Sequence, residues 1–91
     1  MEIRLYATLR QVAGAKLITI PDAQLRTVRD ALLALLEVQP ALKPLLWNAE
    51  GTLVGHVAVI LNGRDIRSLN GVDTPMSSAD RLDIFPPVGG G

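Results

Sequence analysis

Only one segment of this chain has the pattern of a long amphipathic helix, and it occupies residues 27–39. A capping box at residues 27–30 (TVRD), with Asp30 in place of the usual Glu, predicts Thr27 as the N-cap. The apolar side chains that follow recur at helical spacing: Val28, Leu32, Leu35 and Leu36. Because the residue before a proline is biased away from helix, Pro40 should end this segment. The remaining apolar runs of the chain are therefore candidates for strands.

The first twenty residues predict an antiparallel hairpin. Residues 2–8 alternate as in a half-buried strand, with one set inward and the other outward: Ile3, Leu5 and Ala7 against Arg4, Tyr6 and Thr8. Residues 9–14 form a short connection that ends at Gly14, which suits a turn. Residues 16–20 predict a second strand, stopped by Pro21 and Asp22. Two strands joined this closely pair most simply with each other.

The second half of the chain predicts three more strands. Residues 53–61 end in the β-prone run VAVIL and lead into Asn62-Gly63, a dipeptide typical of a type I′ turn. A short return strand follows at residues 64–66, and residues 72–78 form a loop. The last strand covers residues 81–85, with alternate side chains inward (Leu82, Ile84) and outward (Asp83, Phe85). Residues 41–50 are ambiguous, and their leucines and Trp47 suit a short turn over one edge of the core.

The resulting order, β-β-α-β-β-β, predicts an α+β fold. A mixed sheet with one main helix packed across it describes a ubiquitin-like β-grasp roll, whereas a ferredoxin-like fold would need a second real helix in the same length. We expect one domain over residues 1–85 and an extended tail over residues 86–91.

Composition excludes several functional classes. The chain has no cysteine, so disulfides, thiolate metal sites and cysteine nucleophiles are excluded. Nine basic and nine acidic residues give a formal charge of zero, which argues against nucleic acid or an anionic membrane as partner. The first ten residues, MEIRLYATLR, carry alternating charge and no uninterrupted apolar run, so they predict neither a signal peptide nor a membrane span. A cytoplasmic location is therefore the default expectation. His56 is the only histidine, and we expect no metal site at it. Asp80 and Asp83 suit a solvated face better than an acid–base pair.

The end of the chain is its most informative part. Pro86 and Pro87 stiffen the chain after the last strand, and Val88 then leads to three glycines without side chains, Gly89, Gly90 and Gly91. Six residues beyond Phe85 reach roughly 20 Å when extended. On composition alone, a frayed end or an expression scar explains such a tail as well as a functional arm does.

The chain resembles the ubiquitin-like sulfur carriers of the molybdopterin synthase small-subunit and thiamine sulfur-carrier family over almost its full length. The resemblance rests on four stretches: LYA at 5–7 with LRQVAG at 9–14, TVRDAL at 27–32, VILNG at 59–63, and FPPV at 85–88 followed by Gly90-Gly91. The ending is the most specific stretch. It is more similar to the molybdopterin branch, or to related archaeal protein modifiers, than to the shorter thiamine carriers. One departure from the pattern is that Gly89 stands before the diglycine.

The resemblance implies a chemistry at Gly91. An E1-like adenylating enzyme would use ATP to form an acyl-adenylate on its carboxylate, and a sulfur donor would then displace AMP and leave a thiocarboxylate. Residues without side-chain bulk let the arm enter a narrow active site. In this family the molybdopterin synthase large subunit, as a heterotetramer with the carrier, supplies the acid–base groups. The chain itself is then a non-catalytic subunit that needs no bound cofactor.

Two aromatic residues suggest where a partner docks. Strand parity places Tyr6 and Phe85 on the outward face, and a ubiquitin-like sheet sets the first and last strands side by side. Arg10 lies just beyond the first strand and suits the rim of this patch. The three residues match positions that the family uses against its partners, so we expect an interface there together with residues 86–90. The alternative is that residues 41–50 cover the two aromatic rings.

Three functions remain open at this point. The favoured one is a sulfur carrier for molybdopterin synthesis, acting as the small subunit of molybdopterin synthase. The second is a ubiquitin-like modifier that becomes linked through Gly91 to lysines of target proteins, with thiamine synthesis and tRNA thiolation as further sulfur-transfer roles. The third is a plain binding module whose glycine tail is irrelevant. The first two require the same activation of the carboxylate, so the tail does not separate them.

Overall fold

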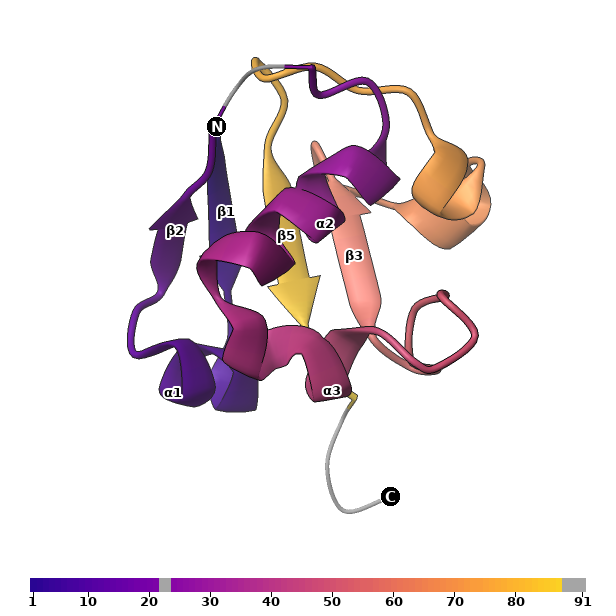
Figure 1. Ribbon diagram of the computed structural model, residues 1–91. Helices are drawn as coiled ribbons and strands as arrows, with labels where there is room; N and C mark the ends of the chain where they lie inside the picture. The colour runs from indigo at the N-terminus through magenta and orange to yellow at the C-terminus, as the bar shows by residue number, and fades with distance from the viewer. Residues whose placement is uncertain (22–23, 88–91) are drawn as a thin grey trace.

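The computed structural model describes residues 1–21 and 24–87. Its strands form one five-stranded sheet: β1 (Glu2–Leu5), β2 (Leu17–Thr19), β3 (Ala58–Leu61), β4 (Arg64–Asp65) and β5 (Leu82–Phe85). The α-helices are α1 (Ala7–Ala13), α2 (Val28–Val38) and α3 (Lys43–Leu46). Short 3₁₀ turns also occur in the described residues: η1 (Pro40–Leu42), η2 (Ile66–Ser68) and η3 (Gly71–Asp73). The prediction of one main helix across a mixed sheet is confirmed, and α2 crosses one face of the sheet (Figure 1).

The strands lie in the order β2-β1-β5-β3-β4. The β1–β2 pair is antiparallel, as the predicted hairpin requires, and the central β1–β5 pair is parallel. In that parallel pair Arg4 lies opposite Asp83, and Leu5 lies opposite Ile84. The expectation that the first and last strands lie side by side is therefore confirmed, and their outward side chains share one face.

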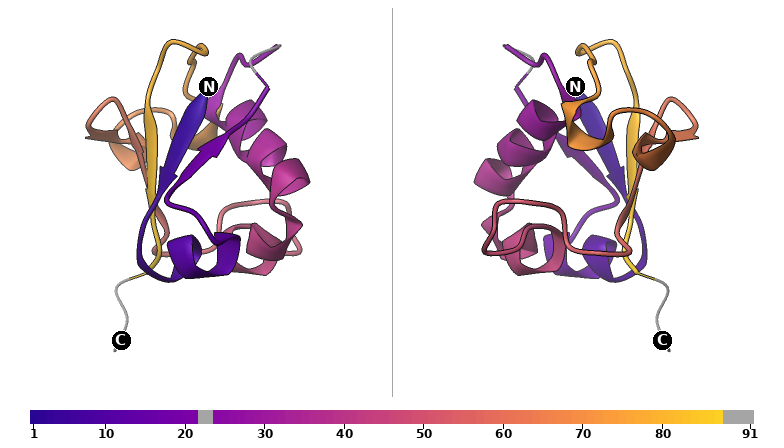
Figure 2. Two further views of the ribbon diagram at one scale, coloured as in Figure 1. Left: turned by 90° about the vertical axis from the view of Figure 1, so that its left-hand side faces the viewer. Right: turned by 90° about the vertical axis from the view of Figure 1, so that its right-hand side faces the viewer.

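The core lies between the sheet and α2. The inward side chains of β1 and β5 are fully buried (Ile3, Leu5, Leu82, Ile84), and the predicted stripe of α2 is buried as well (Val28, Leu32, Leu35, Leu36). Figure 2 shows α2 and α3 on the same side of the sheet, so the layer arrangement is helix on sheet. Burial of this apolar surface is the main source of stability for such a domain.

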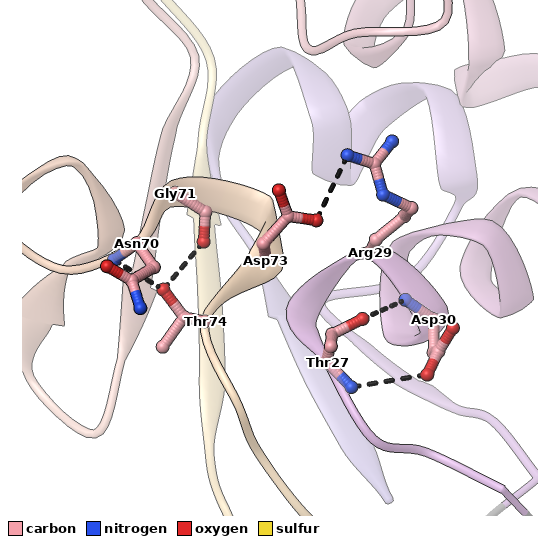
Figure 3. A network of polar contacts seen from close by, with 7 residues as sticks. All are labelled: Thr27, Arg29, Asp30, Asn70, Gly71, Asp73 and Thr74. Carbon is pink, nitrogen blue, oxygen red and sulfur yellow. Dashed lines mark hydrogen bonds and ion pairs between the residues drawn. The ribbon is translucent and has the colours of Figure 1, made fainter.

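The start of α2 is fixed as its capping box predicts (Figure 3). The Thr27 hydroxyl accepts a hydrogen bond from the Asp30 amide at 3.4 Å, and the Asp30 carboxylate accepts one from the Thr27 amide at 3.2 Å. Arg29, which lies between them in the sequence, pairs with Asp73 of η3 at 3.2 Å, while the Thr74 hydroxyl donates to the Gly71 carbonyl at 2.7 Å and closes the 3₁₀ turn. These contacts tie the first turn of α2 to the loop before β5.

The first strand is shorter than predicted, because the chain turns into a helix. β1 ends at Leu5, and α1 replaces both the last residues of the predicted strand and the predicted connection. Ala7 has a positive φ of 53°, which breaks the strand alternation, and its side chain is exposed rather than inward. Gly14 caps α1 in the left-handed conformation, with φ of 75°, so the turn expected there is present.

The ambiguous segment forms the end of the helical layer. η1 packs against α1 and α2, and it buries Leu42, while α3 buries Leu46. Trp47 is half-buried and pairs with Leu53 in an isolated bridge. The segment therefore covers an edge of the core on the helical side of the sheet (Figure 2), and Phe85 stays exposed.

The predicted strands of the second half are confirmed with narrower bounds. β3 begins only at Ala58, since the residues before it form turns, and β4 ends at Asp65, since Ile66 starts a 3₁₀ turn. Asn62 and Gly63 have positive φ values of 51° and 85°, as a type I′ turn requires. The predicted loop 72–78 is irregular apart from the end of η3.

Within residues 1–21 and 24–87, no helix is both long enough and apolar enough to span a bilayer.

Candidate partner-binding site

An aromatic stack stands on the open face of the sheet. The rings of Tyr6 and Phe85 lie with their centroids 4.1 Å apart and their planes 12° from parallel. The stack extends the β1–β5 register by one residue beyond the pair Leu5 and Ile84. Phe85 remains 37% exposed, although it is a large apolar side chain at the end of a central strand. The predicted patch therefore exists, and its exposed ring is available to a partner.

Asp83 supports this stack from the same face. Its Oδ1 accepts a hydrogen bond from the Tyr6 hydroxyl at 3.2 Å, and its Oδ2 pairs with Nε of Arg81 at 3.1 Å. Asp83 is only 7% exposed, so its expected place on a solvated face is wrong. Strand parity correctly predicts that the Asp83 side chain points outward, but the Tyr6 ring and the Arg81 guanidinium cover its carboxylate. A buried carboxylate with two donors fixes the Tyr6 ring in one orientation.

Arg10 lies over the other aromatic ring of the stack. Its guanidinium carbon is 5.6 Å from the centroid of Tyr6, and its Nε donates to the Leu5 carbonyl at 3.3 Å. Both contacts depend on α1, because the sharp turn at Ala7 folds the helix back beside the end of β1. A left-handed alanine costs about 1–2 kcal/mol. The predicted rim residue is thus in place, but a helix carries it rather than a loop.

The chain leaves the sheet directly from the aromatic patch. β5 ends at Phe85, at the same end of the molecule as α1 and α3 (Figure 1). Pro86 is half-buried and Pro87 is exposed, and neither belongs to a strand. The predicted site residues Val88, Gly89, Gly90 and Gly91 lie outside the described residues. The patch and the start of the tail are therefore consecutive along the chain.

The other sequence candidates do not form a site. His56 is exposed in a turn, with φ of 69°, and no group of three metal-ligating side chains occurs in the described part of the chain. Asp80 and Asp83 bind different partners. Asp80 accepts from the Asn62 amide at 3.0 Å and from the Ser77 backbone at 2.8 Å, and these bonds hold the pKa of its carboxyl below the ordinary value.

Sequence reasoning missed a hollow beside the stack. A shallow cavity of about 250 Å³ is lined by Arg4, Tyr6, Arg10, Lys16 and Leu17. Three of these side chains are cations: Arg4 lies on β1, Arg10 lies on α1, and Lys16 directly precedes β2. The basic residues are spread over thirteen positions of the sequence, so only the hairpin and the backward turn of α1 bring them together.

The fold, with an aromatic patch where β1 and β5 end, defines a ubiquitin-like protein. The family model of the ThiS family matches residues 3–91, so the chain belongs to the ThiS family, within the ubiquitin-like sulfur carriers that its sequence resembles. The match covers all the described strands and helices apart from Glu2.

Individual relatives are similar over the whole chain. Small archaeal modifier protein 1 of Haloferax volcanii is 35% identical over 91 residues, which are 100% of both chains. Small archaeal modifier protein 3 of the same organism is 36% identical, covering 100% of this chain and 98% of the relative. The crystal structure of SAMP1 from Haloferax volcanii superposes with a TM-score of 0.88 at 35% identity, covering 100% of this chain and 98% of that one.

Proposed function

We propose that this protein is a ubiquitin-like modifier that also serves as a sulfur carrier, with the carboxylate of Gly91 as its reactive group. The observation that carries the proposal is the full-length similarity to two small archaeal modifier proteins, at 35% and 36% identity. The geometry supports it, since the exposed stack of Tyr6 and Phe85 leads without interruption into Pro86 and the glycine arm. A partner that docks on the stack receives the arm as an effectively intramolecular reactant.

The proposed chemistry begins with activation by an E1-like adenylating enzyme. A carboxylate oxygen of Gly91 attacks the α-phosphorus of ATP, and pyrophosphate leaves. In the modifier role, the ε-amine of a target lysine attacks the acyl carbon, AMP leaves, and the nitrogen loses its proton to form an isopeptide. In the carrier role, a sulfide-level sulfur nucleophile attacks the acyl carbon instead, AMP leaves, and a thiocarboxylate results. Both branches share one activated end, so one docking surface serves both.

The comparisons favour the modifier function over the molybdopterin function that the sequence alone favoured. The relatives reported above are named as protein modifiers, and they match this chain from end to end. The role as a small subunit of molybdopterin synthase stays a prediction. It requires a large subunit that accepts the arm next to a bound pterin precursor.

Identification of the acceptor tests the proposal. The protein with an N-terminal affinity tag would be expressed in its own organism, purified under denaturing conditions, and analysed by mass spectrometry for branched peptides. We expect isopeptides between Gly91 and lysines of other proteins, and none from a variant that lacks Gly90 and Gly91. Tagged protein that carries only a free carboxylate or a thiocarboxylate, with no branched peptide, would contradict the modifier function.

A further inference from the structure

The basic hollow beside the aromatic stack has no counter-charge of its own. In the described parts of the chain, no ion pair involves Arg4, Arg10 or Lys16. The cavity lining contains no carboxylate, although the whole chain is neutral. Three uncompensated cations around about 250 Å³ therefore make a local positive field on a protein without net charge.

The carboxylate that lies opposite Arg4 in the sheet is already occupied. Asp83 lies opposite Arg4 in the β1–β5 register, yet its two oxygens bind the Tyr6 hydroxyl and Nε of Arg81. Glu2 precedes Arg4 by two positions on the same face, but it does not line this cavity. Arg4 is therefore exposed and forms no ion pair within residues 1–21 and 24–87, although it lies opposite Asp83 in the register.

The hollow is continuous with the aromatic stack. Tyr6 belongs to both, because its ring stacks on Phe85 and the residue also lines the cavity. Arg10 is oriented by the Tyr6 ring and by the Leu5 carbonyl, so one cation of the hollow is held in a fixed place. A macromolecule that covers Tyr6 therefore reaches the edge of the hollow that Arg4 and Lys16 line.

We propose that this hollow receives acidic side chains of the partner protein that docks on the aromatic stack. The inference rests on the proposed function, in which that partner is the adenylating enzyme. Charge complementarity selects a carboxylate-bearing surface, and the neutral chain does not favour a polyanion such as nucleic acid. The stack supplies apolar anchoring, and the hollow adds electrostatic attraction that strengthens binding of the partner.

The test is the kinetics of ATP–pyrophosphate exchange by the organism's own adenylating enzyme, with the full chain as substrate. The double variant Arg4→Gln, Lys16→Gln should raise KM about five- to tenfold at low salt and leave kcat unchanged. The difference should shrink at high salt, because exposed charges are screened. Arg4→Lys with Lys16→Arg, which keeps both charges, should restore the wild-type KM. Arg26→Gln is the matched control, since Arg26 is an exposed arginine before α2 and does not line the hollow.

Two outcomes would overturn this inference while the proposed function stands. One is a double variant with a KM within twofold of wild type, when the wild-type protein is adenylated normally. The other is tight binding of inorganic phosphate, monitored by amide chemical shifts of residues around Lys16, which would assign the hollow to a small anion. Absence of exchange with the wild-type protein would instead contradict the proposed function, and the inference would fall with it.

Discussion

Tyr6 and Phe85 come from opposite ends of the chain and stack with their centroids 4.1 Å apart at the point where β1 and β5 end. Their contact is possible because the two strands are parallel neighbours in the centre of the sheet. Asp83 and Arg10 hold the tyrosine from two sides, which leaves Phe85 as the exposed ring. The structure thus presents a rigid aromatic surface next to the first residue of the tail.

Truncation of the exposed ring should weaken partner binding more than it weakens folding. We expect Phe85→Ala to cost about 2 kcal/mol or more in binding to the adenylating enzyme, measured by calorimetric titration. Arg10→Ala should cost less, because Arg10 lies at the rim. Leu33→Ala is a control, since Leu33 is an exposed apolar residue on α2, 43% accessible. Unchanged affinity in both Tyr6→Ala and Phe85→Ala, with folding intact, would exclude this face.

Removal of the tyrosine hydroxyl should destabilise the fold without removing the stack. In Tyr6→Phe the Oδ1 atom of the buried Asp83 loses its donor, and we expect the free energy of unfolding in urea to fall by about 1–2 kcal/mol. The same substitution in an Asp83→Ala background should have almost no effect, because the acceptor is gone. An equal loss in both backgrounds would show that the hydrogen bond does not carry the effect.

The buried leucines of α2 should serve the fold and not the interface. Leu32 and Leu35 are 1% and 0% exposed, so Leu32→Ala or Leu35→Ala should lower the free energy of unfolding by about 2–5 kcal/mol. Partner affinity, measured well below the melting temperature, should stay within twofold of wild type. A stability loss under about 1 kcal/mol would contradict the packing of α2 on the sheet.

Acidification should weaken the turn that leads into β5. Hydrogen bonds from Asn62 and from the Ser77 backbone lower the pKa of Asp80 in the folded protein. A lowered folded-state pKa means that this stabilisation is present above the unfolded pKa and is lost as pH falls through the folded one. The stability difference between wild type and Asp80→Asn, measured by urea unfolding, should therefore be larger at about pH 6 than at about pH 2.5. This stability difference should stay below about 1 kcal/mol at either pH, since solvent screens the Asp80 carboxylate. A difference that does not change with pH would contradict this role.

The aromatic patch was predictable from the sequence because it depends only on strand parity and on which strands are neighbours. The helix α1 was not, since Ile3, Leu5 and Ala7 continue the alternation, and only the left-handed φ of Ala7 ends the strand. α1 is also too short for its apolar spacing to stand out, with Leu9 as its one buried residue.

The polar part of the site depends on contacts that no local pattern encodes. Parity places Asp83 outward correctly, but its burial results from Tyr6, which is 77 positions away in the sequence, and from Arg81. The basic hollow likewise requires the β1–β2 pairing and the position of α1 at once. The formal net charge of the whole sequence is zero, so it does not reveal this local group of cations.

The central claim is that the carboxylate of Gly91 is the reactive group of this protein. ATP–pyrophosphate exchange by the organism's adenylating enzyme tests it most directly, with the full chain and with a chain that ends at Gly89. The described core ends at Ile84, so both chains should melt at nearly the same temperature. The account predicts exchange with the full chain and none with the shortened one. Exchange at the wild-type rate with the shortened chain would contradict it.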